Sequence, residues 1–251
     1  MTTPAGLIVV SYGGGTNSCA MLVGLHERGE RPDHILFADT GGEKPHTYDH
    51  LLTMQDWCAS VGFPPIVTVK GTNPSDHGTL EAFCWAHDSI PSIAFGFKSC
   101  SQRTKGGPLD KYTKAIGGEF TKLIGIDADE SHRQRDFPNT RYPLIEWNWG
   151  RDECVAAIAR AGIQQPGKSA CFFCPSSSRR QIFELRDKYP DLLQRALAME
   201  ANFLEKKPGA VKGLGRRFAW RDLLAFDAAQ INLLPDSPIE IACDCYDGDE
   251  P

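Results

Sequence analysis

Short apolar runs alternate with longer segments of helical periodicity at the start of the chain. The apolar runs cover residues 6–11, 35–40 and 65–70, and each has the length of a buried strand. A helix is predicted over residues 19–28, and residues 46–60 place their large apolar side chains near one helical face. This order of elements predicts an α/β fold in which helices flank a parallel sheet.

The rest of the chain adds one strand and then becomes helical. Residues 120–127 form another apolar run, which ends in acidic and polar residues. Helical patterns then cover residues 151–162, 179–188 and 191–206. We therefore expect a Rossmann-like α/β domain over residues 1–165, with a small helical C-terminal region over residues 166–251 packed on it.

Composition narrows the class of protein. The chain has 251 residues and a formal charge of -5, so its surface is not basic throughout, although a local basic patch remains open. It contains no long apolar run and no basic-then-apolar leader, so we expect a cytoplasmic protein without a membrane partner. Without a secretion signal, its nine cysteines are expected to be reduced thiols, metal ligands or redox centres.

The first strand leads into a run of glycines that predicts a phosphate site. Successive glycines allow the backbone to approach a ligand closely, and the positive end of the following helix favours an anion. Asn17 and Ser18 are expected to cap a helix that begins at Cys19. The alternative is a tight turn without a ligand. The predicted nucleotide-binding residues of this segment are Ser11, Gly13, Gly14, Gly15, Asn17 and Ser18.

Two other predicted strands end in residues suited to the same site. The second strand ends at Asp39 and Thr40, and the strand over residues 120–127 contains Gly125 near its end. Ligands of parallel sheets bind at the carboxyl ends of the strands, so we expect these ends to converge on one crevice. Asp39, Thr40 and Gly125 are therefore added to the predicted nucleotide site.

Two closely spaced cysteines indicate a second kind of chemistry. Cys171 and Cys174 can bind one metal or cluster because two intervening residues let the chain turn back on itself. Cys100 is the best candidate for a third ligand, with Lys98, Arg103 and Lys105 helping to hold it as thiolate. An iron–sulfur cluster, zinc and a redox dithiol all stay open. The cysteines expected to be buried packing residues are Cys19, Cys58, Cys84 and Cys154.

Several segments, taken together and in order, resemble the phosphoadenosine phosphosulfate reductase family and its relatives, the PP-loop ATP pyrophosphatases. The resemblance implies the adenine nucleotide alpha-hydrolase-like fold over most of residues 6–175. The matches are residues 11–18 to SxSGGKDS, 39–45 to DTGxExP, 98–109 to CCxxRKxxPL, 125–131 to GxRADES, 143–147 to PLxxW, and 171–174 to the second cysteine pair of iron–sulfur members.

Departures from the family pattern shape the expected chemistry. Asn17 stands where the loop usually has aspartate, and Asp127 replaces a phosphate-binding arginine. Ser99 replaces the first of two adjacent cysteines, so the resemblance implies a [4Fe–4S] cluster held by Cys100, Cys171 and Cys174 with one iron left open, zinc being the alternative. The intact glycine pair resembles ATP-cleaving relatives more than sulfate-reducing ones.

The resemblance therefore implies a PP-loop sulfurtransferase that uses ATP with Mg²⁺ and releases pyrophosphate. Lys98 or Arg103 would offset phosphate charge, and Cys243 or Cys245 would carry sulfur unless they form a passive tail. A cysteine desulfurase or a thioredoxin-type protein would be the donor. One alternative is a sulfonucleotide (PAPS or APS) reductase using thioredoxin, with Cys243 or Cys245 attacking. Another is a non-catalytic nucleotide-binding module with structural zinc.

The acceptor is predicted from a basic and aromatic stretch near the C-terminus. Such a stretch could bind a nucleic-acid backbone, tRNA or DNA, and stack a base, or it could be a solvated helix face. Its members are Lys206, Lys207, Lys212, Arg216, Arg217, Phe218, Trp220 and Arg221. His46 and His50 lie one helical turn apart, and we interpret them as an ordinary surface pair rather than a metal site.

Overall fold

A computed structural model describes residues 6–70 and 78–229, and the chain divides into two compact units. Among the described residues, the first unit comprises residues 6–39, 43–70 and 105–169, and the second comprises residues 40–42, 78–104 and 170–229. This division differs from the predicted boundary after residue 165. The reason is that residues from the middle of the chain, including Leu80 and Ile90, share an apolar core with the C-terminal helices.

The first unit is built on a five-stranded parallel sheet in the order β3-β2-β1-β4-β5. Its strands are β1 (Leu7–Ser11), β2 (His34–Asp39), β3 (Ile66–Lys70), β4 (Phe120–Ile124) and β5 (Thr140–Arg141). In the central strand, Val10 lies opposite Ile35 of β2 and Leu123 of β4. The direction of strand addition reverses at β1, and such a switch point is where doubly wound sheets bind ligands.

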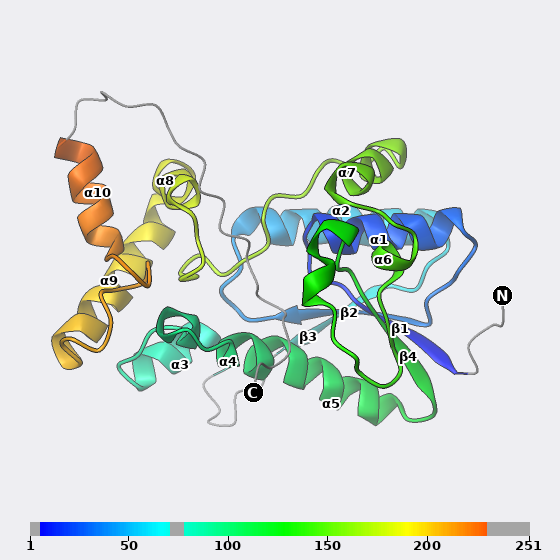
Figure 1. Cartoon of the computed structure of the whole chain (residues 1–251), viewed down its shortest axis with the longest axis horizontal. Helices are drawn as coiled ribbons and strands as arrows, with labels where there is room; N and C mark the ends of the chain where they lie inside the picture. The colour runs from blue at the N-terminus through cyan, green and yellow to red at the C-terminus, as the bar shows by residue number, and fades with distance from the viewer. Residues whose placement is uncertain (1–5, 71–77, 230–251) are drawn as a thin grey trace. The chain divides into compact units, whose positions relative to one another are not determined.

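Helices cover both faces of this sheet (Figure 1). They are α1 (Thr16–Glu27), α2 (Pro45–Ser60), α5 (Gly107–Ile116), a 3₁₀ segment η3 (Ala128–Arg133), α6 (Pro143–Glu146) and α7 (Arg151–Arg160). Val10 faces the apolar cluster formed with α1, α2, α6 and α7, whereas Val9 packs with Leu109 of α5 on the other face. The alternation of β1 side chains thus supplies two cores, and the predicted α/β fold class is confirmed.

The second unit is helical within its described residues. Its elements are α3 (Leu80–Ala86), the 3₁₀ segment η1 (Ser92–Phe95), α4 (Ser99–Ser101), α8 (Arg179–Lys188), α9 (Pro190–Lys206) and α10 (Trp220–Ala229). The π-helical turn η2 (Gln102–Gly106) spans the boundary of the two units, which falls after residue 104. The carboxylate of Glu200, on α9, is fully buried and accepts backbone hydrogen bonds from Leu214 (2.7 Å), Trp220 (2.9 Å) and Arg221 (3.1 Å). These bonds fix the segment between α9 and α10.

Most predicted elements are present, with shifted ends. The bounds of α8 match the prediction, but α1 begins at Thr16 rather than at Cys19. The sequence pattern did not predict α3, α5 or α10. No helix within residues 6–70 and 78–229 has the length and apolar character needed to cross a membrane.

Candidate functional site

The glycine loop of the first unit leaves the start of α1 without a side-chain cap. Gly15 is the N-cap residue, and the first turn contains no acidic side chain. Gly14 has a φ of +76°, a conformation that L-residues with a side chain rarely adopt. Uncapped N–H groups at a helix start carry partial positive charge, so this loop is suited to an anion.

The predicted caps of α1 are wrong. Because the helix begins at Thr16, Asn17 and Ser18 lie inside its first turn. The Ser18 hydroxyl donates back to the Gly15 carbonyl oxygen at 3.0 Å. Asn17 Oδ1 instead accepts a hydrogen bond from Arg151 at 3.4 Å. Since a glycine caps the helix with no side chain, the orphan N–H groups remain open to a ligand.

A buried threonine of α2 packs against the glycine loop. A Cβ atom placed on Gly14 would lie 3.2 Å from Thr47 Cγ2, 3.3 Å from Phe37 Cε2 and 3.5 Å from Ser169 Oγ. Thr47 is 1% exposed, and its hydroxyl has no hydrogen-bond partner in the described part of the chain. A buried hydroxyl without a partner is costly, so this group is a second feature suited to a polar ligand.

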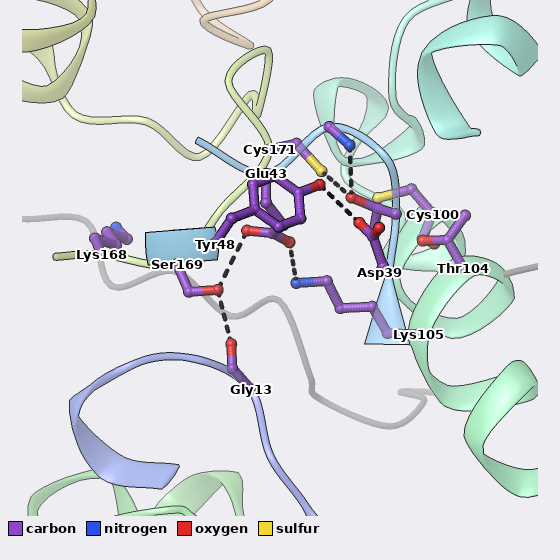
Figure 2. A network of polar contacts seen from close by, with 12 residues as sticks. Gly13, Asp39, Glu43, Tyr48, Cys100, Thr104, Lys105, Lys168, Ser169 and Cys171 are labelled. Carbon is purple, nitrogen blue, oxygen red and sulfur yellow. Dashed lines mark hydrogen bonds and ion pairs between the residues drawn. The ribbon is translucent and has the colours of Figure 1, made fainter. Parts of the chain in front are cut away.

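A polar network links the loop to two segments distant in sequence (Figure 2). Ser169 Oγ lies 2.7 Å from the Gly13 carbonyl oxygen and 3.2 Å from Glu43 Oε2. Lys105 Nζ donates to Glu43 Oε1 at 2.8 Å, and the Glu43 side chain is fully buried. No ligand-binding role was predicted for Glu43 or Ser169, and Lys105, which was predicted to help hold Cys100 as thiolate, forms an ion pair with Glu43. Two signals in the sequence were available: Glu43 lies within the DTGxExP-like segment, and Ser169 lies two residues before Cys171.

Asp39 lies at the carboxyl end of β2, as predicted, and is engaged by a tyrosine. Tyr48 of α2 donates its hydroxyl hydrogen to Asp39 Oδ1 at 2.8 Å (Figure 2). Burial and this hydrogen bond to the carboxylate raise the pKa of Tyr48 well above its ordinary value. The phenol therefore stays protonated and holds the Asp39 carboxylate in a fixed orientation.

Gly125, after β4, comes into close contact with α1. A Cβ atom at Gly125 would lie 3.0 Å from Ser18 N and 3.1 Å from the carbonyl group of Asn17. Only a glycine lets the β4 end approach the first helical turn this closely. The carboxyl ends of β1 and β4 are thus adjacent, as predicted. Asp127 is 3% exposed and caps η3, accepting from Glu130 N at 3.0 Å.

In the second unit, the cysteine pair lies in a tight turn tied to the loop after β2. Cys174 N donates to the Cys171 carbonyl oxygen at 3.0 Å, and Phe172 N donates to the Gly42 carbonyl oxygen at 2.8 Å. Thr40 Oγ1 lies 3.1 Å from Cys171 Sγ (Figure 2). The predicted nucleotide residue Thr40 therefore contacts a thiol, and its carbonyl oxygen accepts from Leu80 N at 3.1 Å.

The three predicted ligand cysteines share one apolar environment. Cys171 and Cys174 belong to the core of the second unit, and Cys100 is half-buried against it. The Cys100 backbone is held by a 2.8 Å hydrogen bond from its N–H to Ser92 Oγ. Thiolate donors in a partly desolvated setting fit an iron–sulfur cluster. Among the described side chains, no three of the Cys, His, Asp or Glu type are grouped as ligands of one metal ion. Cluster and zinc both stay predictions.

The other cysteine and cation predictions divide into three outcomes. The prediction that Cys19, Cys58, Cys84 and Cys154 are buried is confirmed, since all four are at most 1% exposed. Burial raises the pKa of each of these thiols to about 12. Lys98 and Arg103 lie in the second unit, so their proximity to a phosphate stays a prediction. Cys243 and Cys245 lie outside the described residues.

The structure contradicts the predictions for one tryptophan and one histidine, because both side chains are buried. Trp220 is fully buried and cannot stack a base, although Lys212, Arg216 and Arg217 beside it are exposed. The interpretation of the histidines as a surface pair is wrong for His50, which is 7% exposed and whose Nε2 has no partner in the part of the chain described here. Burial, reinforced by His46, lowers the pKa of His50.

Comparison with known proteins gives one informative match. The chain is 31% identical over 198 residues to "Uncharacterized nin region protein ORF290" of Escherichia phage lambda, a match that covers 69% of this chain and 67% of the phage protein. No protein-family model matches the chain. At this level of identity and coverage, the chain belongs to the family of the phage lambda nin region protein ORF290.

Proposed function

We propose that the first unit binds ATP at residues 11–18 and that the chain uses it for sulfur transfer. The observation that carries the nucleotide assignment is the uncapped start of α1 behind a left-handed Gly14. The partnerless hydroxyl of Thr47, packed beside that glycine, supports it independently. The strand order around β1 is also that of nucleotide-binding sheets.

The proposed reaction has two steps that balance without an external oxidant or reductant. An acceptor oxygen first attacks the α-phosphorus of ATP, and pyrophosphate leaves with the electron pair of the broken P–O bond. Loop N–H groups and cations, with Lys98 or Arg103 proposed among them, would stabilise the charge that develops on the phosphoryl oxygens. Sulfide sulfur then attacks the activated carbon, and AMP leaves as the carbon–sulfur bond forms.

The sulfur source is assigned to the thiols of the second unit. Cys100, Cys171 and Cys174 would hold a [4Fe–4S] cluster, which when bound would supply exchangeable sulfide. The shared apolar environment of these thiols supports this assignment. Cys243 and Cys245 remain proposed sulfur carriers: a persulfide on one would be attacked by the thiol of the other, so that a disulfide forms between them and sulfide leaves. We propose the cytoplasm as the compartment, because the buried cysteines Cys19, Cys58, Cys84 and Cys154 are thiols and form no disulfide.

A nucleic acid is the proposed acceptor. The support is the exposed cationic segment between α9 and α10, including Lys212, Arg216 and Arg217. Buried hydrogen bonds from backbone N–H groups to Glu200 hold this segment in place, so the backbone that carries the cationic side chains is fixed. Phosphate contacts by such side chains would make binding weaken steeply with salt.

The test uses anaerobically purified full-length protein. Pyrophosphate release is measured with ATP or with adenosine phosphosulfates, adding tRNA or duplex DNA in separate reactions, and iron and acid-labile sulfide are counted. The proposal expects a brown protein that releases pyrophosphate from ATP when an acceptor is present. Turnover of the phosphosulfates alone would favour the reductase. A colourless protein with one zinc and no turnover would favour a binding module.

A further inference from the structure

Arg151 brings a positive charge to the first turn of α1. It is the first residue of α7, and its Nη1 lies 3.4 Å from Asn17 Oδ1. The side chain is exposed, and within the described residues its guanidinium forms no ion pair. The charge is therefore available to a ligand that binds beside Asn17.

The backbone around Arg151 is fixed to the end of β4. Arg151 N donates to Asp129 Oδ2 at 2.7 Å, and Ala128 N donates to the Trp149 carbonyl oxygen at 2.7 Å. Gly150 packs so closely that an added Cβ would lie 2.7 Å from the Asp129 carboxylate. These contacts place the start of the Arg151 side chain beside the carboxyl ends of β1 and β4. The backbone of Arg151 is thus fixed, and a ligand needs to change only the dihedral angles of its side chain.

The neighbouring charges show why such a cation matters. The carboxylates of Asp39, Glu43 and Asp127 lie at or just beyond the carboxyl ends of β2 and β4, and Lys105 is already paired with Glu43. A polyphosphate bound there would be repelled unless another cation compensates. Asn17 carries no charge, so it orients the guanidinium without neutralising it. An aspartate at the same place would form an ion pair with Arg151.

We propose that Arg151 binds the phosphoryl oxygens of ATP at residues 11–18, and that the neutral Asn17 keeps its charge free to do so. This inference rests on the proposed nucleotide site. It also gives the chain a phosphate-binding cation from α7, whereas position 127 carries a buried aspartate. A guanidinium can donate two parallel hydrogen bonds to a phosphoryl group, which gives geometric selectivity in addition to charge.

The test compares Arg151→Ala with Arg160→Ala by titration calorimetry. Arg160 lies on the same helix but pairs with Glu27 at 3.0 Å, so it is the matched control. ATP, AMP and adenosine are titrated into each full-length protein without Mg²⁺. Loss of a charge-assisted hydrogen bond should weaken ATP binding by on the order of tenfold. Adenosine binding should stay within about twofold, because the cation contacts only phosphate.

Further variants and ligands separate the possible failures. Arg151→Lys should retain part of the ATP affinity, because it keeps the charge but loses the paired donors. Thermal unfolding checks that each variant is folded, and Arg151→Gln replaces the alanine variant if that one is not. If wild-type protein binds ATP more tightly than adenosine but Arg151→Ala and Arg151→Gln bind ATP equally well, the role of Arg151 is refuted. If wild-type protein binds adenosine as tightly as ATP, the proposed phosphate site itself is refuted.

Discussion

Replacing Gly14 with alanine should weaken nucleotide binding strongly while leaving the fold in place. Gly14 has a φ of +76°, and its Cα faces buried side chains of β2 and α2. Gly29, in the turn after α1, has a nearly equal φ of +69° but nothing within 4 Å of an added Cβ. The two alanine variants therefore share the backbone cost and differ in their surroundings.

The magnitudes follow from these two geometries. A left-handed conformation costs an alanine about 1–2 kcal/mol, which lowers the Tm of a chain of this size by roughly 2–8 °C in Gly29→Ala. In Gly14→Ala, the added Cβ would meet Thr47 Cγ2 at 3.2 Å and Phe37 Cε2 at 3.3 Å. Overpacking of this kind adds about 1 kcal/mol. The unfolding free energy of Gly14→Ala should thus fall by roughly 2–3 kcal/mol.

Nucleotide affinity should separate the variants much more strongly than stability. If the alanine displaces the loop so that one N–H no longer reaches a phosphoryl oxygen, about 1.5–3 kcal/mol is lost, or roughly 10- to 150-fold in Kd. Calorimetric titration with ATP and thermal unfolding are measured on both variants. We expect Gly29→Ala to bind ATP within about twofold of wild type. Wild-type affinity in folded Gly14→Ala would refute the assignment of this loop.

Three further predictions concern the polar network, the thiols and the buried histidine. Glu43→Gln leaves Lys105 beside a neutral amide and should lower the free energy of unfolding, measured in urea, by about 3 kcal/mol. The control Glu27→Gln breaks an exposed ion pair with Arg160 and should lower it by under about 1 kcal/mol. Equal losses in the two variants would contradict the role of Glu43. Cys100→Ser should lower the iron bound per anaerobically purified chain, with Ser101→Ala as the control, and unchanged iron would show that Cys100 is not a ligand. Burial holds the pKa of His50 below its usual 6.5, so the unfolded chain binds a proton more readily than the folded chain, and the free energy of unfolding should fall as the pH drops below about 6.5. His50→Gln should reduce that fall between pH 7 and 5. An unchanged dependence of the free energy of unfolding on pH in this variant would refute the contribution of His50.

The architecture around β1 could be predicted because it depends on local signals. Short apolar runs alternate with helical periods of ordinary length, and each strand end carries polar residues. The start of α1 was misplaced for a local reason as well. Asparagine and serine are favoured caps, but Gly15 already serves as the cap in the glycine run, so Asn17 and Ser18 fall inside the helix.

The polar network could not be predicted because it depends on distant pairs. Ser169 and the Gly13 carbonyl are 156 residues apart, and Lys105 and Glu43 are 62 residues apart. Burial of Trp220 likewise depends on packing in the core of the second unit. The basic residues around Trp220 in the sequence instead suggested an exposed side chain. Residues 40–42 belong to the second unit although they directly follow β2 of the first. The hydrophobic periodicity of the sequence does not indicate where the chain passes from one unit to the other.

Hydrogen exchange at the glycine loop tests the central claim most directly. The first-turn N–H groups of α1 have no side-chain cap, so they should exchange quickly in the free protein. On addition of saturating ATP, we expect marked protection in peptides covering residues 11–18 and little change in peptides covering the turn at Gly29. Binding of ATP with no protection of residues 11–18 would contradict the proposed site.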